Sequence, residues 1–168
     1  AMLNYNSDNP VWALFHDRAL PYDIDRDPEF TPSLAEMTQK AIEILSKNEN
    51  GFFLMVEGSQ VDWAAHGNDP VGIITEYLAF DKAVGKAIEF AKKDGETAVV
   101  ILSDHGNSGI TIGKAECKGY DTLTLEELFG EVSKYKLTAS GIEKKLIDVE
   151  PEDMKAEFKK HTDIDLTD

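Results

Sequence analysis

Several residue types are scarce in this chain, and each scarcity excludes a class of protein. Cys117 is the only cysteine, so no disulfide can form within the chain. Arg18 and Arg26 are the only arginines, which leaves little material for bidentate recognition of phosphate. No apolar run approaches the roughly 18 residues that a membrane-spanning helix needs. Basic residues number 17 against 32 acidic ones, and the net charge of −15 argues against a nucleic-acid partner.

What remains is an ordinary composition for a globular protein. The chain has 168 residues, 42% of them hydrophobic, which predicts one soluble unit without a membrane partner. That length is short for an α/β enzyme with a two-metal site. No basic segment followed by an apolar one opens the chain, so we expect no signal peptide in it.

The pattern along the chain predicts three regions. Residues 1–30 are rich in Asn, Asp and Pro and predict an extended N-terminal arm. Residues 31–115 alternate helical and strand patterns and predict an α/β core. Residues 116–168 carry short apolar repeats with helical spacing and predict a small helical appendage, after which the chain looks truncated.

The core region predicts part of a parallel sheet. Two continuous apolar runs, residues 52–56 and 98–102, have the pattern of strands buried on both faces. A helix begins at Thr31-Pro32, and a second runs from Asp69-Pro70 to Gly95 between the two apolar runs. The order helix, strand, helix, strand predicts a βαβ unit with two parallel strands that are neighbours or near neighbours.

Metal-type ligands follow the end of each predicted strand. Glu57 follows the first strand, and Asp104 and His105 follow the second. Asp62 and His66 are spaced i, i+4, so on a helix they share one face. Because ligands bind beyond the carboxyl ends of parallel strands, we expect these side chains to converge at one rim of the sheet. Carboxylates with imidazoles suit zinc, and an isolated carboxylate such as Glu57 suits magnesium.

Each of these residues also has a plainer interpretation. Glu57 could be a charge at a strand end, Asp62 and His66 a surface pair on a helix, and Asp104 a cap beside a solvated His105. Taken one at a time, the plainer interpretations are favoured. Taken together, at two strand ends joined by one crossover, the residues favour a metal site.

The combination resembles the alkaline phosphatases, of the bacterial type. An Asp-x-x-x-His after a Glu-Gly turn, followed some forty residues later by a strand-ending Asp-His, is a specific pattern. The resemblance covers most of residues 10–113 and is carried by Leu20-Pro21-Tyr22, residues 32–38, residues 51–66 and Ser103-Asp104-His105.

The resemblance implies a role for each residue. Asp62 and His66 correspond to ligands of a first zinc, Asp104 and His105 to ligands of a second zinc, and Glu57 to a magnesium ligand. Trp63 corresponds to a residue behind the ligands, near the phosphate. In that family the metals activate a serine that attacks a phosphomonoester and stabilise the leaving oxygen.

The resemblance also implies what is missing. No Asp-Ser-Ala nucleophile segment occurs, so we expect the chain to be a fragment that is inactive alone. The third ligand of the first zinc is a downstream histidine in the family, and we expect neither His161 nor His16 to replace it. The parent enzyme would be periplasmic or extracellular, and the uncovered apolar face of the fragment favours a homodimer.

Two other functions stay open from the sequence. The chain could be a metal-binding or regulatory module without catalysis, or part of another enzyme of the same superfamily, such as a phosphomutase or sulfatase.

Overall fold

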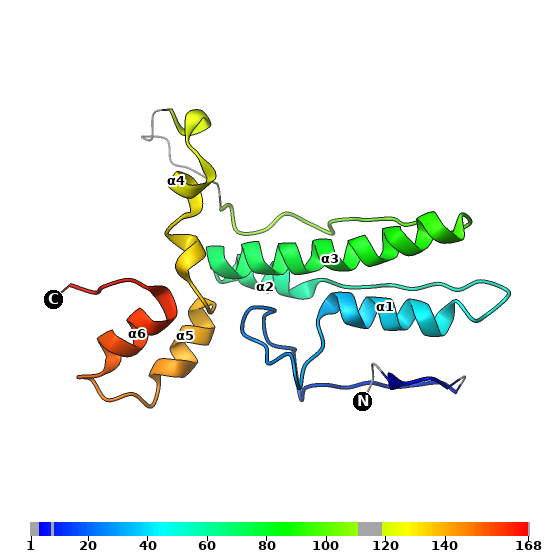
Figure 1. The fold of residues 1–168 in the computed structure, drawn as a ribbon, viewed down its shortest axis with the longest axis horizontal. Helices are drawn as coiled ribbons and strands as arrows, with labels where there is room; N and C mark the ends of the chain where they lie inside the picture. Colours follow the sequence, from blue (N-terminus) through cyan, green and yellow to red (C-terminus); the bar gives the residue numbers. More distant parts are fainter. Residues whose placement is uncertain (1–3, 8, 111–118, 168) are drawn as a thin grey trace.

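The computed structural model describes residues 4–7, 9–110 and 119–167, and their regular structure is helical (Figure 1). Three helices, α1, α2 and α3, form the larger body, and shorter helices follow near the C-terminus. The elements in chain order are α1 (Leu34–Leu45), α2 (Ser59–His66), α3 (Pro70–Asp94), η2 (Tyr120–Thr122), α4 (Leu125–Phe129), η3 (Val132–Lys134), α5 (Ala139–Leu146) and α6 (Met154–Thr162).

The predicted parallel sheet is wrong for this structure, because the described residues form no strand. Residues 52–56 and 98–102 are extended, and both run antiparallel to α3 in Figure 1. A strand exists only as a pair, because its N–H and C=O groups need a neighbouring strand. The apolar runs therefore have the conformation expected of strands but lack the ladder that would make a βαβ unit.

Helix α1 begins later than the sequence indicated. We expected Thr31-Pro32 to cap it, but Ser33 is the N-cap. Ser33 Oγ accepts a hydrogen bond from the Glu36 amide at 3.2 Å, and the Glu36 carboxylate accepts one from the Ser33 amide at 2.8 Å. This reciprocal capping box satisfies two helix-terminal donors, which decides the start in favour of Ser33.

Helix α3 is the longest element and has the predicted ends. Asp69 caps its first turn by accepting from the Gly72 amide at 3.0 Å, and Pro70 occupies the first helical position. Gly95 ends the helix with a left-handed φ of 81°, a conformation that glycine adopts without steric cost.

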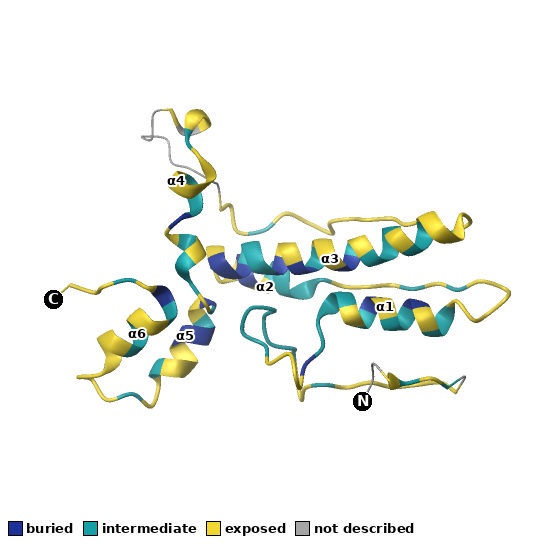
Figure 2. Ribbon diagram, in the orientation of Figure 1, coloured by how far each residue is buried: buried dark blue, intermediate teal, exposed yellow. Residues whose placement is uncertain are grey.

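The core lies where α1 and α2 pack on α3 (Figure 2). Small side chains allow the helices to approach closely, and a Cβ added at Gly72 would lie 2.9 Å from the Ala64 Cβ. The buried apolar residues of these helices are Ile42, Ala64, Ala65, Val71, Ala79 and Ala83. No helix among the described residues is long and apolar enough to cross a membrane.

Two aspartates from the N-terminal half hold the start of α5. Asp25 Oδ1 accepts from the Thr138 amide at 2.9 Å, and Asp25 Oδ2 accepts from the Thr138 hydroxyl at 2.5 Å. Asp69 Oδ2 accepts from the Ala139 amide at 2.7 Å. Because Thr138 is fully buried, its contacts with Asp25 are shielded from water. These hydrogen bonds connect the C-terminal helices to the rest of the molecule.

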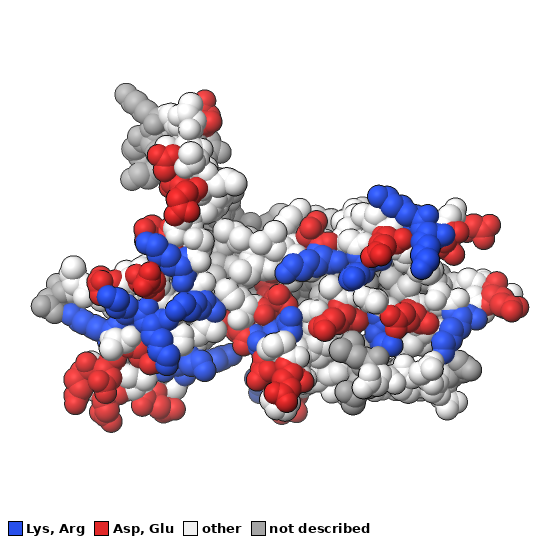
Figure 3. Space-filling model, in the orientation of Figure 1, with Lys and Arg blue, Asp and Glu red and all other residues white. Residues whose placement is uncertain are grey.

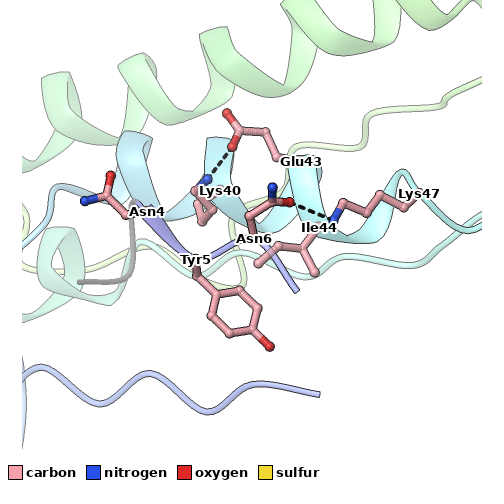
Figure 4. Close-up of a pocket in the computed structure, with 7 residues that line it drawn as sticks. All are labelled: Asn4, Tyr5, Asn6, Lys40, Glu43, Ile44 and Lys47. Atoms are coloured by element: carbon pink, nitrogen blue, oxygen red, sulfur yellow. Dashed lines mark hydrogen bonds and ion pairs between the residues drawn. The ribbon is translucent and has the colours of Figure 1, made fainter. Parts of the chain in front are cut away.

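The first described residues of the N-terminal arm, Asn4 to Asn6, lie beside α1. Figure 4 shows Tyr5 and Asn6 beside Lys47 and Ile44, where they line a pocket of about 260 Å³. Lys47 Nζ donates to Asn6 Oδ1 at 3.2 Å. This end of the arm therefore contacts a helix face.

Charged side chains of both signs cover the face shown in Figure 3, where Lys and Arg are interspersed with Asp and Glu. The described ion pairs include Lys40 with Glu43 at 2.6 Å and Lys159 with Asp165 at 2.6 Å. Surface pairs of this kind contribute at most about 1 kcal/mol each. They serve solubility more than they fix the fold.

Candidate functional site

Helix α2 presents the first pair of predicted ligands. Its Ala64 and Ala65 are buried against the rest of the molecule. Asp62 and His66 are one turn apart, and the distance between Asp62 Oδ2 and His66 Nε2 is 3.5 Å. The predicted i, i+4 pair is therefore formed, with its polar atoms facing each other.

The second pair follows the extended segment after α3. His105 Nε2 lies 3.5 Å from Asp104 Oδ2 and 3.9 Å from Asp62 Oδ1. The four residues Asp62, His66, Asp104 and His105, which we call the ligand cluster, thus come together from two parts of the chain as expected. Asp62 is the link, because it is near both histidines.

Asn107 holds the two parts of the ligand cluster together. Its Nδ2 donates to Asp62 Oδ1 at 2.6 Å and to the Asp62 backbone carbonyl at 3.2 Å. Sequence reasoning missed Asn107. The available signal was an amide side chain two residues after His105, at the end of the second apolar run.

His105 has a defined tautomer in its neutral form. Its Nδ1 is 3.1 Å from the Gly106 carbonyl, which can only accept, so Nδ1 carries the hydrogen. This hydrogen bond, together with the nearby Asp104 and Asp62, raises the pKa of His105 above its ordinary value. Nε2 then bears the lone pair and faces the carboxylates, which is the arrangement of a metal-binding imidazole.

Glu57 is the predicted ligand without a described polar contact to the ligand cluster. Glu57 is exposed. Among the described residues, it forms no hydrogen bond or ion pair with Asp62, His66, Asp104 or His105. It lines a pocket of about 140 Å³ together with Arg26, Ser33 and Glu76. Trp63 is next to Asp62 on α2, with about half of its surface exposed. The proposed magnesium role of Glu57 thus gains no geometric support from this chain alone.

The ligand cluster fits zinc in donor type but is incomplete in number. One carboxylate and one imidazole in each pair are ordinary zinc ligands, and a closed site needs three or four. Within the described ranges, no group of three or more His, Cys, Asp or Glu side chains is arranged to hold a metal ion. Cys117 lies outside those ranges. Within each pair of the ligand cluster, the described residues offer a metal ion two protein ligands.

The other histidines have partners elsewhere. His161 Nε2 is 2.9 Å from Glu157 Oε1 on the same helix, α6, and the His161 carbonyl accepts from the Lys136 amide at 2.9 Å. His16 Nδ1 accepts from the Arg18 amide at 3.4 Å. That neither histidine completes the first zinc site stays a prediction.

Comparisons with known proteins give one consistent result. The family model of alkaline phosphatase matches residues 1–167. Alkaline phosphatase 4 of Bacillus subtilis is 53% identical over 111 residues, which cover 66% of this chain and 24% of that protein. The alkaline phosphatase of Schizosaccharomyces pombe is 39% identical over 120 residues, covering 68% of this chain and 22% of that protein.

A solved structure extends the likeness to the backbone. The cold-active alkaline phosphatase of a psychrophilic Shewanella is 28% identical, and its structure matches 89% of this chain with a TM-score of 0.74. The match covers 35% of the Shewanella chain. This chain thus spans about a quarter of the curated relatives named above and a third of the solved one. It belongs to the alkaline phosphatase family.

Proposed function

We propose that this chain supplies the metal-ligand part of a phosphomonoesterase that uses two zinc ions and a serine nucleophile. The observation that carries the proposal is the position of Asp62. Its carboxylate lies within 4.0 Å of both His66 Nε2 and His105 Nε2, although Asp62 and His105 come from different segments. Convergence of ligand-type side chains from segments distant in sequence supports a shared role more than it supports a chance surface arrangement.

The ligands divide into two pairs. Asp62 and His66 would hold a first zinc, Asp104 and His105 a second, and Glu57 a magnesium ion. When bound, the metals supply positive charge for the phosphoryl oxygens and lower the pKa of a bound hydroxyl.

The residues around the ligand cluster orient it. The Asn107 amide holds one Asp62 oxygen at 2.6 Å, which fixes the carboxylate relative to His105. The Gly106 carbonyl holds the proton of His105 on Nδ1, so that Nε2 is available to a cation. Such positioning contacts matter in a metal site because ligands bind well only in a narrow range of geometries.

The chain alone should not turn over a phosphomonoester. The serine nearest to the ligand cluster in sequence is Ser103, and its hydroxyl donates to the His105 carbonyl at 2.8 Å. Arg26, one of two arginines, is bound to Asp23 at 2.7 Å and to the Thr31 carbonyl at 3.1 Å, so it is not available to a phosphate. Loss of a nucleophile typically removes about six orders of magnitude of rate in enzymes of the covalent type.

A metal-binding module without catalysis is the second candidate. It is favoured by the fact that the ligand cluster assembles within this chain alone. Zinc affinity distinguishes the two functions, because a module that acts by itself needs tight binding, whereas a part of a larger site does not.

The test is calorimetric titration of the full chain with zinc, combined with turnover of p-nitrophenyl phosphate at alkaline pH. We expect weak zinc binding, micromolar or weaker, that is lost in Asp104→Ala and kept in Asp81→Ala, an exposed acidic residue of α3. We expect no turnover. Nanomolar binding would favour the module, and zinc-dependent turnover that disappears in Asp104→Ala would refute the inactivity of the chain.

A further inference from the structure

Helix α2, which carries two residues of the ligand cluster, is too short to hold its own position. It has 8 residues, and isolated helices shorter than about 12–15 residues are marginal in water. Its N-cap is Gly58, which supplies no side-chain cap. The ligand side of α2 is open, because the side chains of Asp62 and His66 are 35% and 68% exposed. The placement of these two ligands therefore depends on contacts that α2 makes through its other residues.

The opposite face of α2 supplies those contacts. Gln60 and Ala64 are spaced i, i+4 and lie on the side of the helix away from Asp62. Ala64 is fully buried, and its methyl group sets how closely α2 approaches α3 but forms no directional bond. Gln60 supplies the directional contact, because its Nε2 donates a hydrogen bond to the Leu20 carbonyl. Gln60 thus ties the first turn of α2 to a segment 40 positions earlier in the chain.

The carbonyl that accepts this hydrogen bond belongs to a segment that is itself held in place. We call residues 20–31, which form the loop beside α2, the anchor segment (Figure 1). The Asp23 amide donates to the Glu76 carboxylate of α3. Asp25 accepts from the Thr138 amide at the start of α5 at 2.9 Å. The acceptor of the Gln60 amide is therefore fixed from two helices.

The Gln60 amide has opposing effects on stability. Its Nε2 forms a good hydrogen bond, whereas its Oε1 is a buried oxygen without a hydrogen-bond partner among the described residues. A buried polar atom without a partner destabilises a fold. Replacement of the amide by an apolar group would remove this oxygen, but it would also leave the Leu20 carbonyl without its donor. The net change in stability should therefore be small, so an effect on metal binding can be separated from an effect on folding.

We propose that Gln60 is a positioning residue for the ligand cluster: its amide fixes α2 to the anchor segment and so holds Asp62 and His66 where the second pair of ligands arrives. The inference rests on the proposed function, in which these residues bind zinc. Asn107 acts on the Asp62 carboxylate itself, whereas Gln60 acts on the helix that carries it. Loss of a residue that orients metal ligands typically lowers metal affinity about 10–100-fold.

The first test compares zinc affinity with stability in Gln60→Met, which has a side chain of similar length without an amide. In calorimetric titration of the full chain with zinc, we expect the Kd to rise about tenfold, with little change in Tm. The matched control is Gln39→Met on α1, where the Gln39 amide donates to Glu43 Oε1 at 3.1 Å on the exposed surface. That variant should leave the Kd unchanged. A lower Tm with an unchanged Kd in Gln60→Met would mean that Gln60 only stabilises the fold, which would overturn the proposal.

The second test needs no metal. Amide hydrogen exchange in EDTA should show protection lowered about tenfold within α2 of Gln60→Met, while α1 and α3 keep theirs, because a helix without its anchor opens locally. Unchanged exchange in α2, or an equal loss in all three helices, would overturn the positioning role.

The two tests also separate this inference from the proposed function. Zinc binding by the wild-type chain that is lost in Asp104→Ala but kept in Gln60→Met would leave the proposed function standing and refute the role of Gln60. A wild-type chain that binds no zinc would refute the proposed function, and exchange in EDTA would still decide whether Gln60 holds α2.

Discussion

Replacing Asp25 by alanine should destabilise the molecule strongly, because Asp25 is the acceptor for two donors of a buried residue. The Thr138 amide donates to Asp25 at 2.9 Å and the Thr138 hydroxyl at 2.5 Å, and Thr138 has no exposed surface. A buried donor without a partner costs about 1–3 kcal/mol. The Thr138 hydroxyl keeps an alternative partner, since Ser140 Oγ lies 3.2 Å away, but the amide does not.

We therefore expect Asp25→Ala to lower the free energy of unfolding by about 2–3 kcal/mol, mostly because the buried Thr138 amide loses its acceptor. Urea unfolding followed by circular dichroism measures this. The matched control is Asp27→Ala, because Asp27 is exposed and its carboxylate accepts only from the Glu29 amide, at 2.9 Å. That variant should change stability by less than about 0.5 kcal/mol. Equal effects of the two substitutions would refute the argument that the Asp25 contacts hold α5.

Three further predictions concern Glu76, Gly58 and Ser33. Burial raises the pKa of Glu76 above its ordinary value of 4.5. The contribution of Glu76 to stability is therefore present below pH 4.5 and is lost as pH rises through the raised pKa. In Glu76→Gln, the free energy of unfolding from urea titrations should depend less on pH over this range. Gly58→Ala would place a Cβ 2.6 Å from Phe80 Cδ2, and the forced shift should cost about 1–3 kcal/mol in thermal unfolding. Ser33→Ala removes the capping box of α1 and should cost about 1 kcal/mol, whereas no loss in chemical denaturation would mean that the cap is dispensable.

The helices were predictable because their signals are local. Asp69, Pro70 and Gly95 mark both ends of α3 within a few residues of the helix itself. The start of α1 was missed by two residues because Thr31 and Ser33 compete as caps, and only Ser33 has a glutamate three positions later.

The sheet was not predictable from the same kind of signal. An apolar run such as 52–56 shows that a segment favours an extended, buried conformation, and it does take an extended one here. Whether it becomes a strand depends on a partner segment distant in sequence, which no local pattern specifies. The described residues contain no such partner.

The ligand cluster was predictable in part. The spacing of Asp62 and His66 on a helix fixes their proximity, and the second apolar run delivers Asp104 and His105 to the same place. Asn107 escaped notice because its reach to Asp62 depends on the turn that follows, where Ser108 has a φ of 64°. The assignment of Glu57 to magnesium stays a prediction.

The contact between Asp25 and Thr138 joins residues that are 113 positions apart. It can therefore form only late in synthesis of the chain. A ribosome adds about 5–20 residues per second, so Asp25 exists for roughly 6–23 s before its partner is made. The residues of α1, α2 and α3 are all made within that interval, whereas those of α5 and α6 follow it. Docking of the C-terminal helices is therefore a late step of co-translational folding, and a slow codon cluster after α3 would prolong the time in which the Asp25 carboxylate stays hydrated.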